Sequence, residues 1–393
     1  MEIREDFLPF SKPWLEQEEF DEVIDTLKSG WITTGPKTKG FEKQLAEYVG
    51  AEHVIAVNSA TAALHIALAA LEIGPGDEVI TTPLTFASTA NVIVHQGATP
   101  VFADVNPDTF NIDPDEIERR ITENTKAIMP VHYGGQACEM DRIMEIAKKH
   151  NIHVIEDGAH TIASYYKGTH LGTIGDFGCY SFYANKNMTT GEGGALVVKD
   201  PELADKCRCL ALHGISKDAW KRFSANGSWY YEVMYPGFKY NMTDINAALG
   251  MHQLKKVASF NARRREICDQ YEAAFADMPE ISFSAQIDEI ESSRHLFPIL
   301  VDESMLTIDR NEFIKELGAR KVGTSVHYIP LHIQPYYRDR FDLKPEDYPN
   351  AYSIYSRLIS MPLHPLMNDE DVAYAIEAVK DIVSLHKKAS VGV

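Results

Sequence analysis

The chain has 393 residues, of which 45% are hydrophobic and 24% charged, the balance of a globular protein large enough for more than one core. Its formal net charge of −19 argues against nucleic acid or an anionic membrane surface as the main partner, because both bind to basic patches. No uncharged apolar run approaches the length of a membrane span, the N-terminus lacks an apolar signal core, and the five cysteines lack the spacing of a zinc site. We therefore expect a cytoplasmic protein with reduced thiols and no bound metal.

Short apolar strands alternate with helical stretches in the first half of the chain. Helices are predicted at residues 41–48, 60–71 and 139–149, and a turn at Gly74-Pro75-Gly76-Asp77. Strands are predicted at residues 78–82, 99–103, 127–131, 153–157, 178–182 and 195–198. This alternation predicts an α/β fold with a mostly parallel sheet and helices on both faces, in which ligands bind beyond the carboxyl ends of the strands.

The second half of the chain is more helical. A long helix is predicted over residues 244–276, followed by strands at 296–301 and 323–327 and helices at 310–317 and 369–385. We expect an N-terminal arm and a large α/β domain over residues 1–257, and a linking helix with a small α+β domain over residues 258–393.

Two ionisable residues stand at predicted strand ends. Asp157 closes the strand 153–157, where it can cap a helix or, in the ligand crevice, keep the nitrogen of a pyridine cofactor protonated. Lys186 follows the strand 178–182, a place where a lysine is usually solvated. However, three glycines within residues 191–194 allow the backbone to pass close to a ligand, and a partly desolvated lysine can form a Schiff base.

Two further segments complete this pattern. Asn58-Ser59-Ala60-Thr61 opens an Ala-rich helix, either as a simple cap or as a phosphate seat, because free N–H groups at a helix start attract an anion. Phe86 is either core or a ring that stacks on a pyridine. The sequence contains no Walker loop and no dinucleotide-binding glycine fingerprint, so NAD binding has no support. Each feature is weak alone, but their order and their placement at strand ends together predict one ligand site.

These stretches resemble the DegT-type nucleotide-sugar aminotransferases, which are pyridoxal 5′-phosphate (PLP) enzymes of the aspartate aminotransferase fold, or PLP fold type I. The resemblance covers nearly the whole chain. Its most specific stretches are Glu156-Asp-Gly-Ala-His160, residues 181–194, Phe238-Lys-Tyr-Asn-Met-Thr-Asp-Ile-Asn246 and residues 327–337. The family fold has a large domain with a mostly parallel sheet flanked by helices and a small α+β C-terminal domain.

The resemblance assigns roles to residues of this chain. Lys186 is the catalytic residue and holds PLP as a Schiff base, while Asp157 pairs with the pyridine nitrogen. In the rest of the cofactor site, Phe86 would stack on the ring, His160 would hydrogen-bond the PLP hydroxyl, and Ala60, Thr61 and Ser181 would hold the phosphate. Asn241 would reach the cofactor phosphate of a neighbouring subunit, which implies a homodimer with shared active sites. The candidates for sugar binding, each of which could instead be structural, are Thr33, Lys37, Tyr183, His327 and His332.

The reaction implied by the resemblance has two halves. L-Glutamate gives up its amino group and leaves as 2-oxoglutarate, with Lys186 as general base and acid, and a keto sugar then takes the amine. Residues 31–37 and 327–332 resemble the branch that acts at C4 of UDP-linked 4-keto pentoses and 4-keto-6-deoxyhexoses. Another hexose, a GDP- or dTDP-sugar and reaction at C3 stay open, because Tyr183 stands where some members carry His and a shared fold does not fix specificity.

Two alternatives fit the same fold. One is a PLP-dependent sugar dehydratase or other lyase, which Lys186 disfavours because related dehydratases replace this lysine with His. The other is a non-catalytic sugar-binding regulator, which the presence of both Lys186 and Asp157 disfavours.

Overall fold

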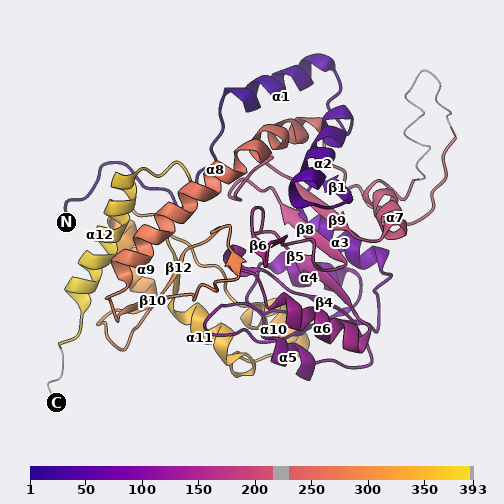
Figure 1. Ribbon diagram of the computed structural model, residues 1–393. Helices are drawn as coiled ribbons and strands as arrows, with labels where there is room; N and C mark the ends of the chain where they lie inside the picture. The colour runs from indigo at the N-terminus through magenta and orange to yellow at the C-terminus, as the bar shows by residue number, and fades with distance from the viewer. Residues whose placement is uncertain (216–229, 390–393) are drawn as a thin grey trace.

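The computed structural model describes residues 1–215 and 230–389 and is built around a seven-stranded sheet (Figure 1). In spatial order the strands are β1 (His53–Val57), β9 (Gly194–Val198), β8 (Phe177–Ser181), β5 (His153–Asp157), β4 (Thr125–Met129), β2 (Glu78–Thr81) and β3 (Thr99–Phe102). The strands from β8 to β3 are parallel to one another, and β9 is antiparallel to both of its neighbours. The predicted mostly parallel sheet is therefore confirmed.

Helices cover both faces of this sheet. Successive residues of a strand point to opposite faces. Ile155 accordingly packs with α3 (Ala60–Ala70), α4 (Ala87–His95) and α7 (Pro201–Ala211), whereas Val154 packs with α5 (Pro114–Arg119) and α6 (Met140–His150). At the β1 end, Ala56 packs on that second face with α2 (Pro36–Val49) and α8 (Asp244–Phe275). Burial on both faces explains why the central residues of these strands, such as Val79-Ile80, Ala127-Ile128 and Val154-Ile155, are apolar.

The 32-residue helix α8 links two cores. Figure 1 shows it running from α1 (Gln17–Ser29) and α2 at one end to α12 (Asp369–His386) at the other. Its last turns pack against the antiparallel sheet of β10 (Ile281–Phe283), β12 (Pro298–Val301) and β13 (Leu358–Ser360), and against α9 (Arg310–Ala319) and α12. The predicted domain boundary between residues 257 and 258 lies inside this continuous helix and stays a prediction.

The remaining elements are short. β6 (Tyr165–Tyr166), β7 (Thr169–His170) and β11 (Ile290–Glu291) form a small sheet, while α10 (Pro335–Phe341) and α11 (Pro349–Arg357) pack near β3. The predicted strand at 323–327 is wrong, because this segment makes only the isolated bridge from Ser325 to Ser360. In the part of the chain that the structure describes, no helix is long and apolar enough to cross a membrane.

The carboxyl ends of β1, β5 and β8 meet at one edge of the main sheet. β5 and β8 are parallel, and β1 runs in their direction because β9, which lies between β1 and β8, is antiparallel to both. Asp157 at the end of β5, Ser181 at the end of β8 and the start of α3 after β1 therefore share this edge. Gly194, the first residue of β9, pairs there with both Val57 and Ser181.

Gly194 allows the start of α3 to lie directly against the sheet. A Cβ atom at this position would lie 2.4 Å from the carbonyl carbon of Ser59 and 2.5 Å from the nitrogen of Ala60. Both are backbone atoms, so a larger residue at 194 would have to displace α3 itself.

We expect Gly194→Ala to lower the free energy of unfolding by about 1–3 kcal/mol, because the added methyl group overpacks this contact. Urea unfolding of the full chain measures the change. Gly318→Ala is the matched control: its site in α9 has no heavy atom within 4 Å of the added Cβ. This second substitution should instead raise the free energy of unfolding by about 0.5–1 kcal/mol, and equal destabilisation by both would contradict the contact argument.

Candidate active site

A cavity of about 450 Å³ opens at the shared edge of β1, β5 and β8, a size typical of cofactor and small-molecule sites. Its walls come from segments far apart in the sequence. The lining residues are Ser59, Ala60, Thr61, Thr85, Phe86, Ser88, Val131, Asp157, Ala159, His160, Ser181, Tyr183, Asn185, Lys186, Glu192, Gly193, His327 and Tyr328.

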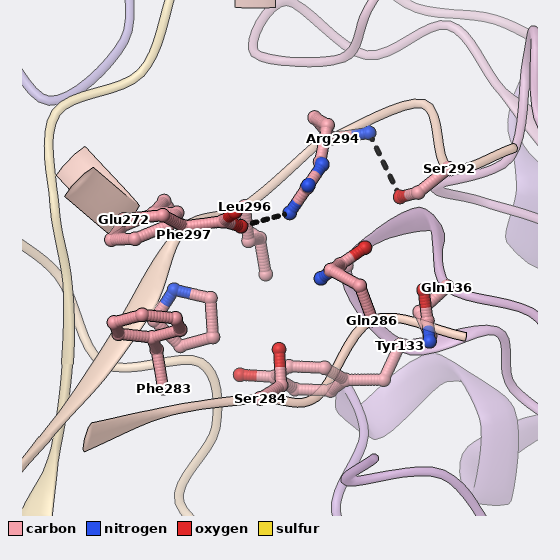
Figure 2. A pocket seen from close by; sticks show the side chains of 12 residues that line it. Tyr133, Gln136, Glu272, Phe283, Ser284, Gln286, Ser292, Arg294, Leu296 and Phe297 are labelled. Atoms are coloured by element: carbon pink, nitrogen blue, oxygen red, sulfur yellow. Dashed lines mark hydrogen bonds and ion pairs between the residues drawn. The ribbon is translucent and has the colours of Figure 1, made fainter. Parts of the chain in front are cut away.

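A second cavity, of about 20 Å³, lies among residues that include Tyr133, Gly134 and Gln136 (Figure 2). Its volume suits a single water molecule. Its charged groups already pair with each other, since an Arg294 guanidinium nitrogen lies 2.8 Å from a carboxylate oxygen of Glu272. The larger cavity is therefore the candidate active site.

Asp157 is 3% exposed, and hydrogen bonds hold both of its carboxylate oxygens. Thr89 Oγ1 donates to Oδ2 at 2.8 Å, and the Ala159 N–H donates to Oδ1 at 3.2 Å. Burial raises the pKa of this carboxyl, while the bonds from Thr89 and Ala159 and the nearby Lys186 act in the opposite direction. A buried carboxylate held in this way can pair with a cationic ring nitrogen.

Lys186 lies in the turn that follows β8, and the next residue anchors this turn. Asn187 Nδ2 donates to the Ser293 carbonyl at 2.7 Å, and Asn187 Oδ1 accepts a hydrogen bond from His295 Nδ1 at 2.9 Å. Burial lowers the pKa of Lys186 from 10.5 to about 8, although the carboxylate of Asp157 acts in the opposite direction. About a tenth of the amine is therefore unprotonated, and nucleophilic, at pH 7, far more than for an ordinary lysine.

The start of α3 offers backbone donors to the cavity. Ser59 caps the helix by accepting a hydrogen bond from the Ala62 N–H at 3.1 Å. The N–H groups of Ala60 and Thr61 donate to no acceptor within residues 1–215 and 230–389. Free N–H groups and the helix dipole together favour an anion. This end of the cavity, which Ser181 also lines, therefore fits a phosphate group.

Aromatic and imidazole side chains also line the cavity. The ring of Phe86 is 62% exposed and lies 6.1 Å, centroid to centroid, from that of Tyr328. His327 Nδ1 lies 2.9 Å from Ser360 Oγ, and burial together with Lys186 lowers the pKa of His327 to about 4. This imidazole is therefore neutral at physiological pH. An exposed flat ring beside the amine and the carboxylate completes a site that fits a pyridine cofactor.

Asn241 and Thr33, which the sequence also predicts as site residues, lie outside the cavity but close to each other in the fold. Asn241 forms an antiparallel bridge with Val57, and its Nδ2 donates to Thr34 Oγ1 at 2.6 Å. The Thr33 carbonyl accepts a hydrogen bond from the Asp244 N–H at 3.1 Å. Residues 31–37 and residues 238–246, both of which carry the family resemblance, are therefore neighbours in the fold.

Lys37 and His332 also lie outside the cavity. Lys37 Nζ pairs with the carboxylates of Glu22 and, at 2.7 Å, Asp25. His332 is buried against Tyr348, with 4.8 Å between the ring centroids. These contacts do not support a sugar-binding role for Lys37 or His332. That role stays a prediction.

Several residues that line or support the cavity were not predicted as site residues, and Thr89 and Tyr328 are two of them. Thr89 reaches Asp157 from α4, and nothing in the local sequence distinguishes it from an ordinary helical threonine. Tyr328 lies within the recognised run of residues 327–337, next to His327, and this adjacency was a usable signal.

Comparisons with known proteins agree with this geometry. The model of the DegT/DnrJ/EryC1/StrS aminotransferase family matches residues 13–380. SpsC of Bacillus subtilis (strain 168), a spore coat polysaccharide biosynthesis protein, is 53% identical over 381 residues, which cover 97% of this chain and 98% of SpsC.

Solved structures of similar proteins extend the comparison. Spr1654 of Streptococcus pneumoniae, assigned as a sugar aminotransferase, matches in its PMP form with a TM-score of 0.91 and 41% identity over 96% of this chain and 99% of that one. Its PLP form matches with a TM-score of 0.90. PseC of Helicobacter pylori, an aminotransferase involved in pseudoaminic acid biosynthesis, matches with a TM-score of 0.89 and 32% identity over 97% of this chain and 100% of PseC.

Thr89→Val should weaken binding of PLP to the apoprotein roughly tenfold or more, because Asp157 loses a hydrogen bond to its charged form. Fluorescence titration of the apoprotein with PLP measures the dissociation constant. Thr81→Val is the matched control, since the buried Thr81 hydroxyl donates to the Met129 carbonyl, at 2.8 Å, instead of to a cavity residue. If both variants bind PLP equally well, Thr89 does not support the carboxylate.

Proposed function

The chain belongs to the DegT/DnrJ/EryC1/StrS aminotransferase family of PLP-dependent sugar aminotransferases, and on that basis we propose that it transfers an amino group from L-glutamate to C4 of a nucleotide-linked keto sugar. The acceptors we favour are UDP-linked 4-keto pentoses and 4-keto-6-deoxyhexoses. The observation that carries the proposal is the convergence of Lys186, Asp157 and the free N–H groups of α3 on one cavity.

We assign each group of lining residues to one part of PLP. Lys186 Nζ would hold the cofactor covalently, and Asp157 would face its ring nitrogen. Phe86 would stack on the ring, and His160 would face the phenolic oxygen. Ala60, Thr61 and Ser181 would hold the phosphate. Bound PLP supplies an electron sink for the bonds at the amino-bearing carbon.

Lys186 is also the proposed proton carrier. A pKa lowered to about 8 leaves enough of its amine unprotonated to remove the proton from Cα of glutamate. In the second half of the reaction, the protonated amine would deliver a proton to C4 of the sugar. Because both substrates use the same amine in the same cavity, 2-oxoglutarate should leave before the keto sugar binds, which predicts ping-pong kinetics.

The charge of the cavity favours a dimeric enzyme. Among the lining residues within the described ranges, Lys186 is the one lysine or arginine, whereas both Asp157 and Glu192 are acidic. Glutamate is a net anion with two carboxylates, and a nucleotide sugar carries the negative charge of its phosphates. We therefore propose a homodimer in which a second subunit completes the site, with Asn241 reaching the cofactor phosphate across the interface.

The surface of α1 supports this dimer. The face toward α8 buries Glu19 and Thr26, whereas Phe20, Ile24 and Leu27 on the other side are 46%, 45% and 53% exposed. We infer that this exposed apolar row is part of the dimer interface.

The choice of a nucleotide-linked sugar rests on the family branch and on the relatives. Residues 31–37 and 327–332 resemble the branch acting at C4. The names of SpsC and PseC refer to the biosynthesis of a spore coat polysaccharide and of pseudoaminic acid. Lys186 in the cavity favours amino transfer over dehydration.

A panel of nucleotide-linked keto sugars tests the proposed substrate. With L-glutamate and PLP, we expect a UDP-linked 4-keto sugar to gain an amino group, detected by mass spectrometry, and 2-oxoglutarate to form in equal amount. Lys186→Ala should reduce turnover by several orders of magnitude, because one side chain both holds the cofactor and moves the proton. Loss of the sugar hydroxyl without incorporation of nitrogen would instead indicate a dehydratase.

Mixed dimers test the shared site. If Asn241 acts across the interface, a hybrid of one Lys186→Ala and one Asn241→Ala subunit contains one intact site. Random mixing of the two inactive variants should then restore about one quarter of the wild-type activity, since about half of the dimers are hybrids. If Asn241 acts within its own subunit, every site stays damaged and the mixture shows no gain over the separate variants.

A further inference from the structure

His160 is fixed in position from three sides. The Gly134 N–H donates to its Nδ1 at 3.2 Å, and the His295 ring lies 4.3 Å away, centroid to centroid. Ser293 Oγ donates to the backbone carbonyl of His160 at 2.6 Å. Gly134 adopts a left-handed conformation, with φ of 62°. The imidazole therefore has one defined orientation, with Nε2 directed toward Tyr328 in the cavity wall.

The bond from Gly134 also fixes the tautomer of His160. A backbone N–H can only donate, so Nδ1 must be the unprotonated nitrogen and the proton of the neutral ring lies on Nε2. His160 Nε2 lies 3.0 Å from Tyr328 Oη and donates to it. The hydroxyl hydrogen of Tyr328 is then free, because Tyr328 Oη has no other hydrogen-bond partner among the described residues.

His160 Nε2 and Tyr328 Oη line the same cavity and lie 3.0 Å apart. The single Nε2 proton goes to Tyr328, so an acceptor oxygen placed between the two groups would take this proton in place of Tyr328. An oxygen acceptor that receives a hydrogen bond from His160 Nε2 lies within reach of the Tyr328 hydroxyl as well. Phe86, the proposed stacking residue, contacts the same tyrosine ring.

The charges around this pair leave His160 neutral. Burial lowers the pKa of His160 well below 6.5, and Lys186, His327 and His132 act in the same direction. Burial and the carboxylate of Asp157 raise the pKa of the Tyr328 hydroxyl, so this hydroxyl keeps its proton. The titratable groups that face the pair come from five segments, and they are His132, Tyr133, Asp157, Lys186, His295 and His327.

We propose that Tyr328 is a second hydrogen-bond donor to the phenolic oxygen of bound PLP and that it sets, together with His160, the pH at which the bound cofactor loses its proton. The inference rests on the proposed placement of His160 beside that oxygen. Tyr328 would then change the charge on the phenolic oxygen of the cofactor, besides lining the cavity.

The direction of the effect follows from the charge. The phenolic oxygen is negative and attracts the proton on the nitrogen that links PLP to Lys186. A hydrogen bond from Tyr328 withdraws negative charge from the oxygen and weakens this attraction. Without the hydroxyl the proton is held more tightly, so the titration midpoint of the bound cofactor rises.

The test is a pH titration of the PLP holoenzyme followed by visible absorption, without substrate. Tyr328→Phe removes the hydroxyl and should raise the midpoint by about one to two pH units. Replacing Tyr328 with 3-fluorotyrosine keeps the ring and makes the hydroxyl a stronger donor, so the midpoint should fall. This second replacement also tests the idea if the phenylalanine variant does not fold.

Tyr133→Phe is the matched control. The Tyr133 hydroxyl donates to the His327 carbonyl, and its ring contacts Tyr328 edge-on at 6.5 Å, but Tyr133 does not line the large cavity. Its removal should leave the midpoint unchanged. If Tyr328→Phe also leaves the midpoint unchanged while His160→Ala shifts it, the role of Tyr328 is refuted and the proposed function stands. If none of the variants shifts it, the placement of His160 in the proposed site is wrong as well.

Discussion

Asp157 and Lys186 share one cavity, and burial acts on their charges in opposite directions. It raises the pKa of the carboxyl and lowers that of the amine to about 8. The two groups are not equally supported, because Thr89 and Ala159 hold the carboxylate whereas Lys186 Nζ has no hydrogen bond among the described residues. The amine is therefore the group that more readily gives up its charge. That asymmetry is what PLP requires: a neutral amine for the covalent bond and a carboxylate for the ring nitrogen.

An acidic protein can bind anionic ligands, because the electrostatic potential at a binding site depends mainly on the charges and dipoles close to it. The net charge is −19, but charges more than about 8 Å away across solvent are largely screened at physiological ionic strength. A phosphate at the start of α3 would meet two free N–H groups directly. Gly194 makes this possible by letting that helix start lie on the sheet, and His65 on the same helix bonds Tyr240, the neighbour of Asn241, at 3.0 Å. This hydrogen bond links α3, which starts at the phosphate end of the cavity, to the segment of Asn241, which we propose to face the partner subunit.

The sequence predicted most of this site because chemistry-bearing residues sit at strand ends. The rule that parallel strands end at a common edge placed Lys186, Asp157, Phe86 and the start of α3 together, and the family resemblance assigned their roles. Thr89 could not be found in this way, since its contact with Asp157 depends on how α4 lies on the sheet. The strand β1 was also missed, because it lies between helical stretches and its partner β9 follows only after more than a hundred residues.

Contacts from both sheets hold the segment of His327 and Tyr328 in place at the cavity. His327 bonds Ser360 of β13 in the small sheet, its carbonyl accepts the Tyr133 hydroxyl beside the large sheet, and Tyr328 meets His160. The segment is therefore tied to both cores, which α8 already joins as one continuous helix. Side chains on such a support have fixed directions before any ligand binds, which lowers the entropy lost on binding. By contrast, Tyr183 and Glu192 are exposed at the cavity, so discrimination among sugars is expected to depend more on them than on the cofactor wall.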